Sequence, residues 1–280
     1  MDDEREHAAA VEEPNRTDAG RRWAAELSEW AIPGEILSQA PSSPWRHDPA
    51  TFVVDETLDR AVRSAEMARS VLPPTGGSVL DVGCGGGRAA MSLVPPAERV
   101  IGVDADPRML AAFTAAASAA SARSMAIEGT WPDAAADTPV ADVVTCHHVA
   151  YNVAAIEPFL LALTDHARLA VVLVLPIVHP MTAFNEAWRH FWDLDRPQGP
   201  TADRLGEVLR ELGIETERAD MPRPPLASAT SDPSTRVPSL RRRLCLGDGV
   251  SDQEIAAFLD DHEPAWSDTH AVFRWPGEPS

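Results

Sequence analysis

Short apolar segments alternate with segments of helical periodicity through most of the chain. Between the apolar segments, nonpolar residues recur at spacings of three and four, as on one face of a helix. In chain order the apolar segments are 78–82, 99–104, 124–128, 142–146, 169–175, 214–221 and 270–275. Strands that are mostly apolar and separated by helices are typical of a parallel sheet covered on both faces. The pattern predicts an α/β fold with a seven-stranded, mostly parallel sheet and helices on both faces.

The N-terminal part of the chain precedes this alternation. Residues 1–20 are acidic and Ala-rich without clear periodicity, which is typical of a disordered tail. Helical spacing of nonpolar residues returns around Trp23 and again over 51–72, where a run of Pro and Gly follows. These two segments predict an N-terminal helical cap over residues 21–74.

The alternation is interrupted again after the fifth apolar segment. Residues 181–194 form an aromatic stretch at helical spacing that includes Trp188, and further helical patterns follow the Pro-rich segment near 225. We therefore expect one domain over 75–280, with helical insertions at about 177–200 and 230–264.

Charge and residue usage exclude several classes of function. The net charge is −19, and all 24 basic residues are arginine. The absence of lysine excludes Schiff-base chemistry and a P-loop. A strongly acidic chain is also a poor match for a protein that grips phosphate backbones, so we expect no nucleic-acid partner. Three scattered cysteines without a Cys-x-x-Cys pair predict neither a metal site nor a disulfide framework.

The ends and apolar runs of the chain indicate a location. The N-terminus is acidic, the reverse of a signal peptide, and the longest apolar run, 169–178, is too short to span a bilayer. We therefore expect a cytoplasmic protein without a membrane segment.

A glycine-rich turn at 83–87 follows the first apolar segment and precedes a helical one. Strand, glycine turn and helix together form the first half of a nucleotide-binding βαβ unit, which predicts a Rossmann-like sheet. A dinucleotide fingerprint, Gly-x-Gly-x-x-Gly, is a poor match because Arg88 stands at its third glycine position. The pattern acid-x-Gly-x-Gly-x-Gly is satisfied in full by Asp81, Gly83, Gly85 and Gly87.

This stretch resembles motif I of the class I S-adenosylmethionine-dependent methyltransferases, with a type 11/25-like domain. Residues 100–110, with Asp104 at the end of the second apolar segment, resemble the second motif of that family. Residues 142–148 resemble its strand-four motif, and the resemblance covers roughly residues 75–175. It implies S-adenosyl-L-methionine as the cofactor and methyl transfer as the reaction.

The resemblance also implies where the cofactor binds. Asp81 would lie near the methionine amino group, although an acid at this place is also explained as a turn or helix-cap residue. Asp104 would bind the ribose hydroxyls in a bidentate manner. An acid is missing at Thr130, and Trp131 is equally explained by stacking on adenine or by loop packing. The implied cofactor contacts are Asp81, Gly83, Cys84, Gly85, Gly87, Asp104, Ala105, Gly129, Thr130, Trp131 and His147.

Residues after the fourth apolar segment would face the methyl group and the substrate. His147 or His148 is a candidate general base, since imidazole titrates near neutral pH. Tyr151 and Asn152 are candidate substrate contacts, with packing at a helix start as the alternative. Trp188 is a further candidate, although an aromatic helix face is more often core.

Three functions remain open at this point. The first is methyl transfer from S-adenosylmethionine to an unidentified small-molecule acceptor. The second is a nicotinamide-dependent oxidoreductase, against which Arg88 and the missing lysine weigh. The third is a non-catalytic S-adenosylmethionine-binding protein, because the motifs concern only the cofactor.

Overall fold

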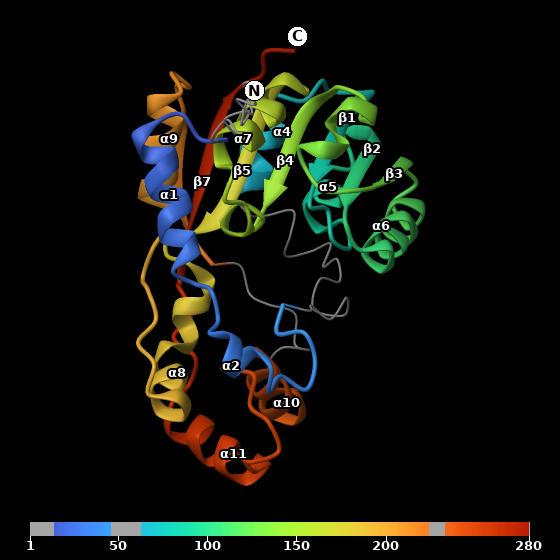
Figure 1. The fold of residues 1–280 in the computed structure, drawn as a ribbon. Helices are drawn as coiled ribbons and strands as arrows, with labels where there is room; N and C mark the ends of the chain where they lie inside the picture. Colours follow the sequence, from blue (N-terminus) through green and yellow to red (C-terminus); the bar gives the residue numbers. More distant parts are fainter. Residues whose placement is uncertain (1–13, 46–62, 224–232, 280) are drawn as a thin grey trace, which may run out of the picture.

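A twisted seven-stranded sheet with helices on both faces forms the upper part of the molecule (Figure 1). The structure, a computed structural model, describes residues 14–45, 63–223 and 233–279. The strand order is β3-β2-β1-β4-β5-β7-β6, and only β7 runs antiparallel to its neighbours β5 and β6. The strands are β1 (Gly77–Val82), β2 (Ala97–Asp104), β3 (Arg123–Glu128), β4 (Ala141–His147), β5 (Ala167–Pro176), β6 (Glu217–Pro222) and β7 (Thr269–Pro276). The seven-stranded, mostly parallel sheet expected from the sequence is confirmed.

Alternation along the strands builds two cores, because successive side chains point to opposite faces of a sheet. Leu80 and Val144 face one core, which is covered by α1 (Asp18–Ser28), α7 (Ile156–Asp165) and α9 (Ala202–Glu211). Val79 and Val143 face the other, which is covered by α4 (Arg63–Arg69), α5 (Arg88–Met91) and α6 (Pro107–Ala119). Both faces of the central strands are therefore buried, which explains their continuous hydrophobicity.

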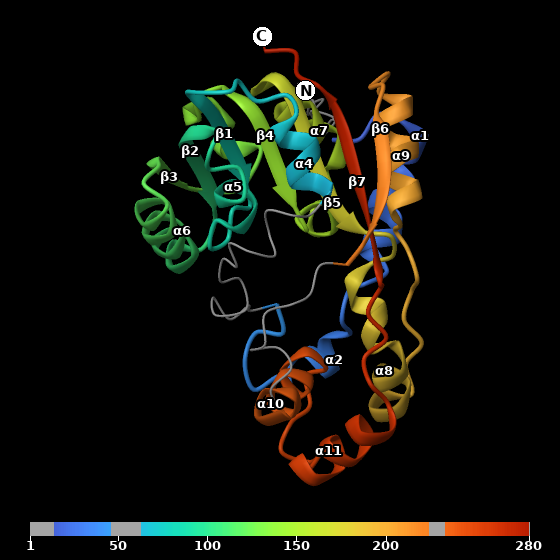
Figure 2. The same cartoon turned by 180° about the vertical axis from the view of Figure 1, so that it is seen from behind.

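A third apolar cluster lies below the sheet and defines what we call the helical lobe (Figures 1 and 2). Its elements are α2 (Gly34–Leu37), η4 (Pro180–Phe184), α8 (Asn185–Trp192), α10 (Pro233–Arg243) and α11 (Asp252–Asp261). The two insertions expected at about 177–200 and 230–264 thus pack against each other in one cluster. The parallel strands point their carboxyl ends toward this lobe.

The segment expected to form an N-terminal helical cap, residues 21–74, is largely helical where it is described, and its helices pack at three places. Helix α1 packs against α7 and α9 on one face of the sheet, α4 packs against β5 and β7 on the other, and α2 belongs to the lobe. The segments are separated because each has its own apolar stripe, and each stripe is buried at a different place. Most of the helix expected over 51–72 lies outside the described residues.

The expected tail over 1–20 includes residues that are ordered in the structure. Residues 1–13 lie outside the described part, whereas Asn15 and Thr17 are already anchored to the start of α7. Thr17 caps α1 through its side chain, which explains why the helix begins at Asp18. Among the described residues, no helix combines the length and the apolar character that a bilayer crossing requires.

Candidate functional site

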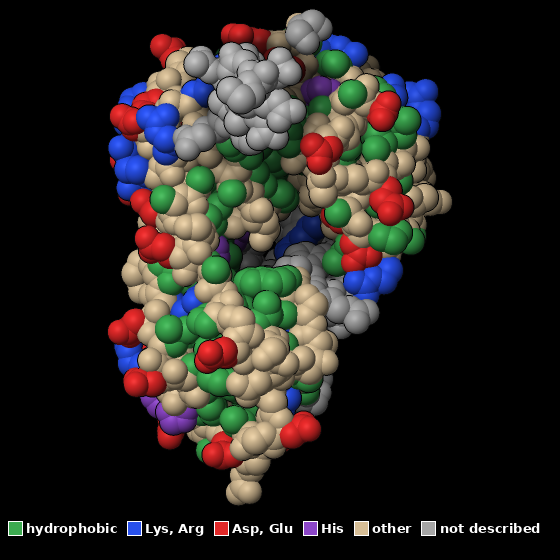
Figure 3. Space-filling view, viewed as in Figure 1, with side chains coloured by type: hydrophobic (Ala, Val, Ile, Leu, Met, Phe, Trp, Pro, Cys, Tyr) green, Lys and Arg blue, Asp and Glu red, His purple; other side chains and the backbone are tan. Residues whose placement is uncertain are grey.

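The carboxyl ends of the parallel strands meet at the edge of the sheet that faces the helical lobe. Ligands of open α/β sheets bind at this edge, where the loops after neighbouring strands diverge. In the space-filling view the surface is hollowed between the sheet domain and the lobe (Figure 3). The glycine turn after β1, Asp104 at the end of β2 and His147 at the end of β4 all belong to this edge.

The glycine turn has a backbone that other residues adopt only with strain. Gly83, Gly85 and Gly87 all have positive φ, at 68°, 50° and 90°. A Cβ on Gly83 would lie 2.3 Å from Cγ2 of Val149, so the loop after β4 closes over this glycine. The amides of Gly83 and Cys84 both donate to the carbonyl of Val103, which holds the turn against β2.

Asp104 is held in place by the same turn. Its Oδ2 accepts a hydrogen bond from the Gly85 amide at 2.9 Å, and its Oδ1 accepts one from the Asp106 amide at 2.9 Å. Each carboxylate oxygen keeps acceptor capacity, because an ionised carboxylate has about four lone-pair sites. The side chain is partly exposed, and the following Ala105 is exposed beside it.

Asp81 does not face the hollow. It is 1% exposed, and its carboxylate accepts hydrogen bonds from Thr145 Oγ1 at 2.9 Å and from the Ala90 amide at 3.2 Å. Burial raises its pKa to about 7, against the lowering effect of these two hydrogen bonds. The placement corresponds to the turn-acid alternative: Asp81 ties β1 to β4 and α5, and the carboxylate lies too deep for the expected methionine contact in this conformation.

The loop after β3 contains both exposed residues and a buried tryptophan. Gly129 donates its amide to the carbonyl of Asp104 at 3.1 Å, and the exposed Thr130 bonds Asp133 through its hydroxyl. Trp131, in contrast, is 8% exposed and meets His166 edge to face at 4.9 Å. Its indole packs into the core of the sheet domain, as the loop-packing alternative expects.

Cys84 is likewise a packing residue. The side chain is 5% exposed, and its sulfur lies 3.6 Å from the Gly85 carbonyl. Burial raises the pKa of the thiol, with the nearby Asp81 and Asp104 adding to the effect. Any contact of Cys84 with a ligand is therefore left to its backbone.

Three histidines gather at the ends of β4 and β7. His148 has φ of 63°, and its amide donates to the Val174 carbonyl of β5 at 2.8 Å. Its ring lies 6.3 Å from that of His147 and 4.8 Å from that of His270, edge to face in both cases. His270 is 5% exposed, and its Nδ1 has no hydrogen-bond partner among the described residues.

The surroundings keep these imidazoles neutral. Burial lowers the pKa of His147 to about 4, and the nearby His270 and Arg88 add to the lowering. Burial also lowers the pKa of His270 to about 4, helped by Arg223, and the pKa of His148 falls well below its ordinary value. His148 is exposed, and a neutral imidazole there has one nitrogen that donates and one that accepts a hydrogen bond.

His270 was not expected from the sequence. No sequence motif links His270 to His148, because more than 120 residues separate the two. Only the pairing of β7 beside β5, with His270 opposite Pro176, brings the two rings together.

Of the three expected substrate contacts, two are buried and one is exposed. Tyr151 is 4% exposed, stacks on Trp23 and donates its hydroxyl to the Pro176 carbonyl at 2.7 Å. Trp188 is 1% exposed and lies in the core of the lobe, under the guanidinium of Arg196. Both are therefore packing residues, because their polar groups or rings are already enclosed by protein. Asn152 is exposed beside Tyr151.

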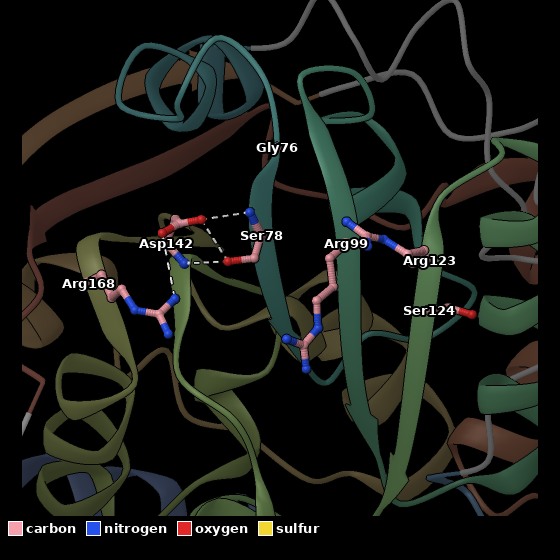
Figure 4. A pocket seen from close by; sticks show the side chains of 7 residues that line it. All are labelled: Gly76, Ser78, Arg99, Arg123, Ser124, Asp142 and Arg168. Atoms are coloured by element: carbon pink, nitrogen blue, oxygen red, sulfur yellow. Dashed lines mark hydrogen bonds and ion pairs between the residues drawn. The ribbon is translucent and has the colours of Figure 1, made fainter.

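A separate groove lies at the opposite edge of the sheet (Figure 4). It has a volume of about 510 Å³ and lies at the amino ends of the strands. Asp142 there accepts hydrogen bonds from the amide and hydroxyl of Ser78, and Arg168 lies 3.6 Å from the same carboxylate. The groove is thus remote from the glycine turn. Within the described ranges no group of His, Cys, Asp and Glu side chains has the arrangement of a metal site.

The part of the chain that holds the turn matches a known family. Residues 79–169 match the model of a methyltransferase domain. No curated protein matches the chain.

Solved structures show the same fold. The YcgJ protein from Bacillus subtilis is 16% identical, with 78% of this chain and 98% of that chain covered and a TM-score of 0.51. A cyclopropane-fatty-acyl-phospholipid synthase-like protein from Lactobacillus casei is also 16% identical, with 90% and 99% covered and a TM-score of 0.53. At this identity the likeness concerns the fold alone.

Proposed function

We propose that this chain, which belongs to the class I S-adenosylmethionine-dependent methyltransferases, methylates a small molecule bound between the strand ends and the helical lobe. The matched domain contains the glycine turn and Asp104, and its family disfavours a nicotinamide-dependent oxidoreductase. The molecule that accepts the methyl group is not identified, and we propose where it binds and how it reacts.

The preset carboxylate of Asp104 is the observation that carries the cofactor assignment. Hydrogen bonds from the amides of Gly85 and Asp106 fix it at the edge of the glycine turn. In our proposal the two oxygens receive the vicinal ribose hydroxyls. The backbone of Gly83, Gly85 and Gly87 faces the methionine part, together with the backbone of Cys84.

The adenine base lies, in this proposal, between the ends of β2 and β3. At that edge Ala105 and Thr130 are exposed and Gly129 is half-buried. Trp131 supports this edge from behind, since it is buried against His166.

The reaction is an in-line displacement at the sulfonium methyl. The bond between carbon and sulfur breaks as the bond from carbon to the acceptor atom forms, and S-adenosylhomocysteine leaves. Alignment and exclusion of water account for much of the rate of such a reaction. The helical lobe, which stands opposite the strand ends, provides the second wall that this requires.

His147 and His148 stand where the acceptor would lie in this pose. As neutral imidazoles they orient the acceptor by accepting a hydrogen bond from it. A pKa near 4 makes His147 a weak base, since a general base works best with a pKa near the working pH. We therefore propose that the acceptor atom is already a good nucleophile and that His147 and His148 orient it without serving as a general base.

We further propose that the enzyme works in the cytoplasm on a small molecule. Cys84, Cys146 and Cys245 are buried and unpaired in the described structure, as expected in a reducing compartment. The net charge of −19 disfavours a nucleic-acid acceptor.

Calorimetry with S-adenosylmethionine, S-adenosylhomocysteine and NADH tests the cofactor site. Asp104→Ala removes two charge-assisted hydrogen bonds, each worth about 1.5–3 kcal/mol, so affinity for S-adenosylmethionine should fall about 100-fold or more. Asp165→Ala, at an exposed position on the end of α7, is the control and should bind like the wild type. Binding of NADH without S-adenosylmethionine, or full affinity in a folded Asp104→Ala variant, contradicts the proposal.

A further inference from the structure

The run Arg241-Arg242-Arg243 at the end of α10 is the one basic cluster in an acidic chain. The three side chains differ in their hydrogen-bond and ion-pair partners. Arg241 bonds Asp252 at 2.7 Å and also donates to the carbonyls of Gly247 and Val250. It therefore closes the turn between α10 and α11, which is a structural role.

Arg242 and Arg243 have no such partners. Among the described residues neither forms an ion pair with a carboxylate, and Nε of Arg242 is buried without a hydrogen-bond acceptor. A shortage of acids does not explain this, because the chain has 43 acidic and 24 basic side chains. The carboxyl end of α10 offsets part of the charge, but that effect is typically below 1 kcal/mol.

The surroundings of Arg243 are apolar and aromatic. Its guanidinium carbon lies 5.5 Å from the centre of the Phe184 ring, and Nη1 lies 3.8 Å from the sulfur of Met181. Phe184 in turn meets Trp266 edge to face at 5.2 Å, and Trp266 is 39% exposed. Burial lowers the pKa of Arg243, and Arg242 adds repulsion. Arginine nevertheless stays charged in proteins.

This place is connected by short chain segments to the histidine end of the site. Segment η4, which carries Phe184, begins directly after His179. Trp266 precedes His270 by four residues, so their Cα atoms are separated by at most about 14 Å. Arg243 thus belongs to the wall of the lobe that continues into the strand carrying His270.

A half-buried guanidinium with no counter-ion among the described residues is costly, and a planar guanidinium fits a carboxylate through two parallel hydrogen bonds. We propose that Arg243, supported by Arg242, binds a carboxylate carried by an aromatic ligand, whose ring lies on the side of Phe184 and Trp266. This names the class of the methyl acceptor, an aromatic carboxylic acid, and it rests on the proposed function.

The test uses the full chain saturated with S-adenosylhomocysteine, and four probes at constant ionic strength. Calorimetry with benzoate, phenyl phosphate, inorganic phosphate and benzylamine should give measurable binding of benzoate and none of benzylamine. Arg243→Met keeps the apolar stem and removes the charge, so it should weaken benzoate binding at least ten-fold. Arg189→Met is the matched control, since Arg189 is an exposed arginine of the same lobe paired with Asp195, and it should leave benzoate binding unchanged.

Several results overturn the inference. These are equal affinity of benzoate for Arg243→Met and wild type, binding of benzylamine as tight as benzoate, or tighter binding of inorganic or phenyl phosphate than of benzoate. If Arg243→Met does not fold, Arg243→Lys keeps the charge without the fork, and unchanged benzoate affinity in it likewise counts against the proposal. Binding of S-adenosylhomocysteine is read in the same experiment. If the wild type does not bind S-adenosylhomocysteine, the proposed function is contradicted. If it binds S-adenosylhomocysteine but not benzoate, only this inference is contradicted.

Discussion

The rings of His148 and His270 lie 4.8 Å apart, edge to face, although the residues belong to strand ends separated by β5. The left-handed backbone of His148 turns its side chain out of the line of β4, and pairing of β7 with β5 places His270 beside it. The contact makes a pair of neutral imidazoles where we propose that the acceptor binds. It also links the chemistry of the site to the stability of the fold at low pH.

The first prediction concerns this link. His179 and His270 are both buried, and burial lowers the pKa of each to about 4, against about 6.5 in an unfolded chain. The unfolded state therefore binds more protons between these values, so the free energy of unfolding falls as the pH drops from about 6.5 to about 4.

His270→Phe keeps a ring and removes one of these groups. Relative to this variant, the wild type should lose up to about 1.4 kcal/mol of stability per pH unit within that window. Urea unfolding at several pH values measures the difference. A difference that is the same at pH 7 and pH 4.5 contradicts the placement of a neutral, enclosed His270.

The second prediction concerns the closure of the glycine turn. Gly83→Ala should destabilise the folded protein in two ways. An alanine at this positive φ costs about 1–2 kcal/mol, and its Cβ would lie 2.3 Å from the side chain of Val149. Gly213→Ala is the matched control, because Gly213 also has positive φ, 77°, but nothing within 4 Å of the added Cβ. Thermal unfolding of both variants isolates the contact with Val149. Equal losses of stability show that the loop after β4 does not close over the turn.

The third prediction decides the role of Asp81. Its pKa is raised to about 7 by burial, so the folded state holds the proton more tightly than the unfolded one between about pH 4 and 7. Stability from this group is present at low pH and is lost as the pH rises through 7. Asp81→Asn does not titrate, so its stability relative to the wild type should increase as the pH rises, by at most about 1.4 kcal/mol per unit.

The same variant separates structure from binding. Since Asp81 lies under the turn, Asp81→Asn should change the affinity for S-adenosylmethionine less than three-fold. A folded variant that loses this affinity by ten-fold or more restores the methionine contact that the motif resemblance implies.

The fourth prediction concerns the anchoring of the N-terminal segment. The buried carboxylate of Glu157 accepts hydrogen bonds from the amides of Arg16 and Thr17 and from the hydroxyl of Thr17, at 2.7–2.9 Å. Burial raises its pKa, but these hydrogen bonds outweigh that effect and lower it overall. The stability that they provide is present above about pH 4.5 and is lost as the pH falls further.

Glu157→Gln replaces an oxygen acceptor with an amide donor that faces backbone N–H groups. We expect a loss of about 1–3 kcal/mol at pH 7 and faster tryptic cleavage after Arg16 and Arg21. Glu186→Gln, at an exposed position on α8, should change neither quantity. Unaltered cleavage in Glu157→Gln means that the segment is held by other contacts.

Several features of the fold and of the cofactor edge could be predicted from the sequence because they depend on local order. Periodicity along the chain determines the strands, so all seven were found within a few residues of their bounds. The placement of Asp104 beside the glycine turn also follows locally, since the first two parallel strands of such a unit lie next to each other. The helical character of the N-terminal segment was predicted as well, but the places where its helices pack were not, because the place where an apolar stripe is buried is not encoded in its spacing.

Orientation and long-range packing were decided by the tertiary structure alone. A motif position does not reveal that the carboxylate of Asp81 turns under the loop, or that Trp131, Tyr151 and Trp188 are enclosed by protein. These outcomes depend on which elements cover each side chain, and those elements come from distant parts of the chain. The sequence by itself determined the sheet, the glycine turn and the cofactor class, because each depends on neighbours in the chain. Only the folded chain brings His270 to His148 and leaves Arg243 without a carboxylate among the described residues, because burial and pairing across the sheet and the lobe exist only after folding.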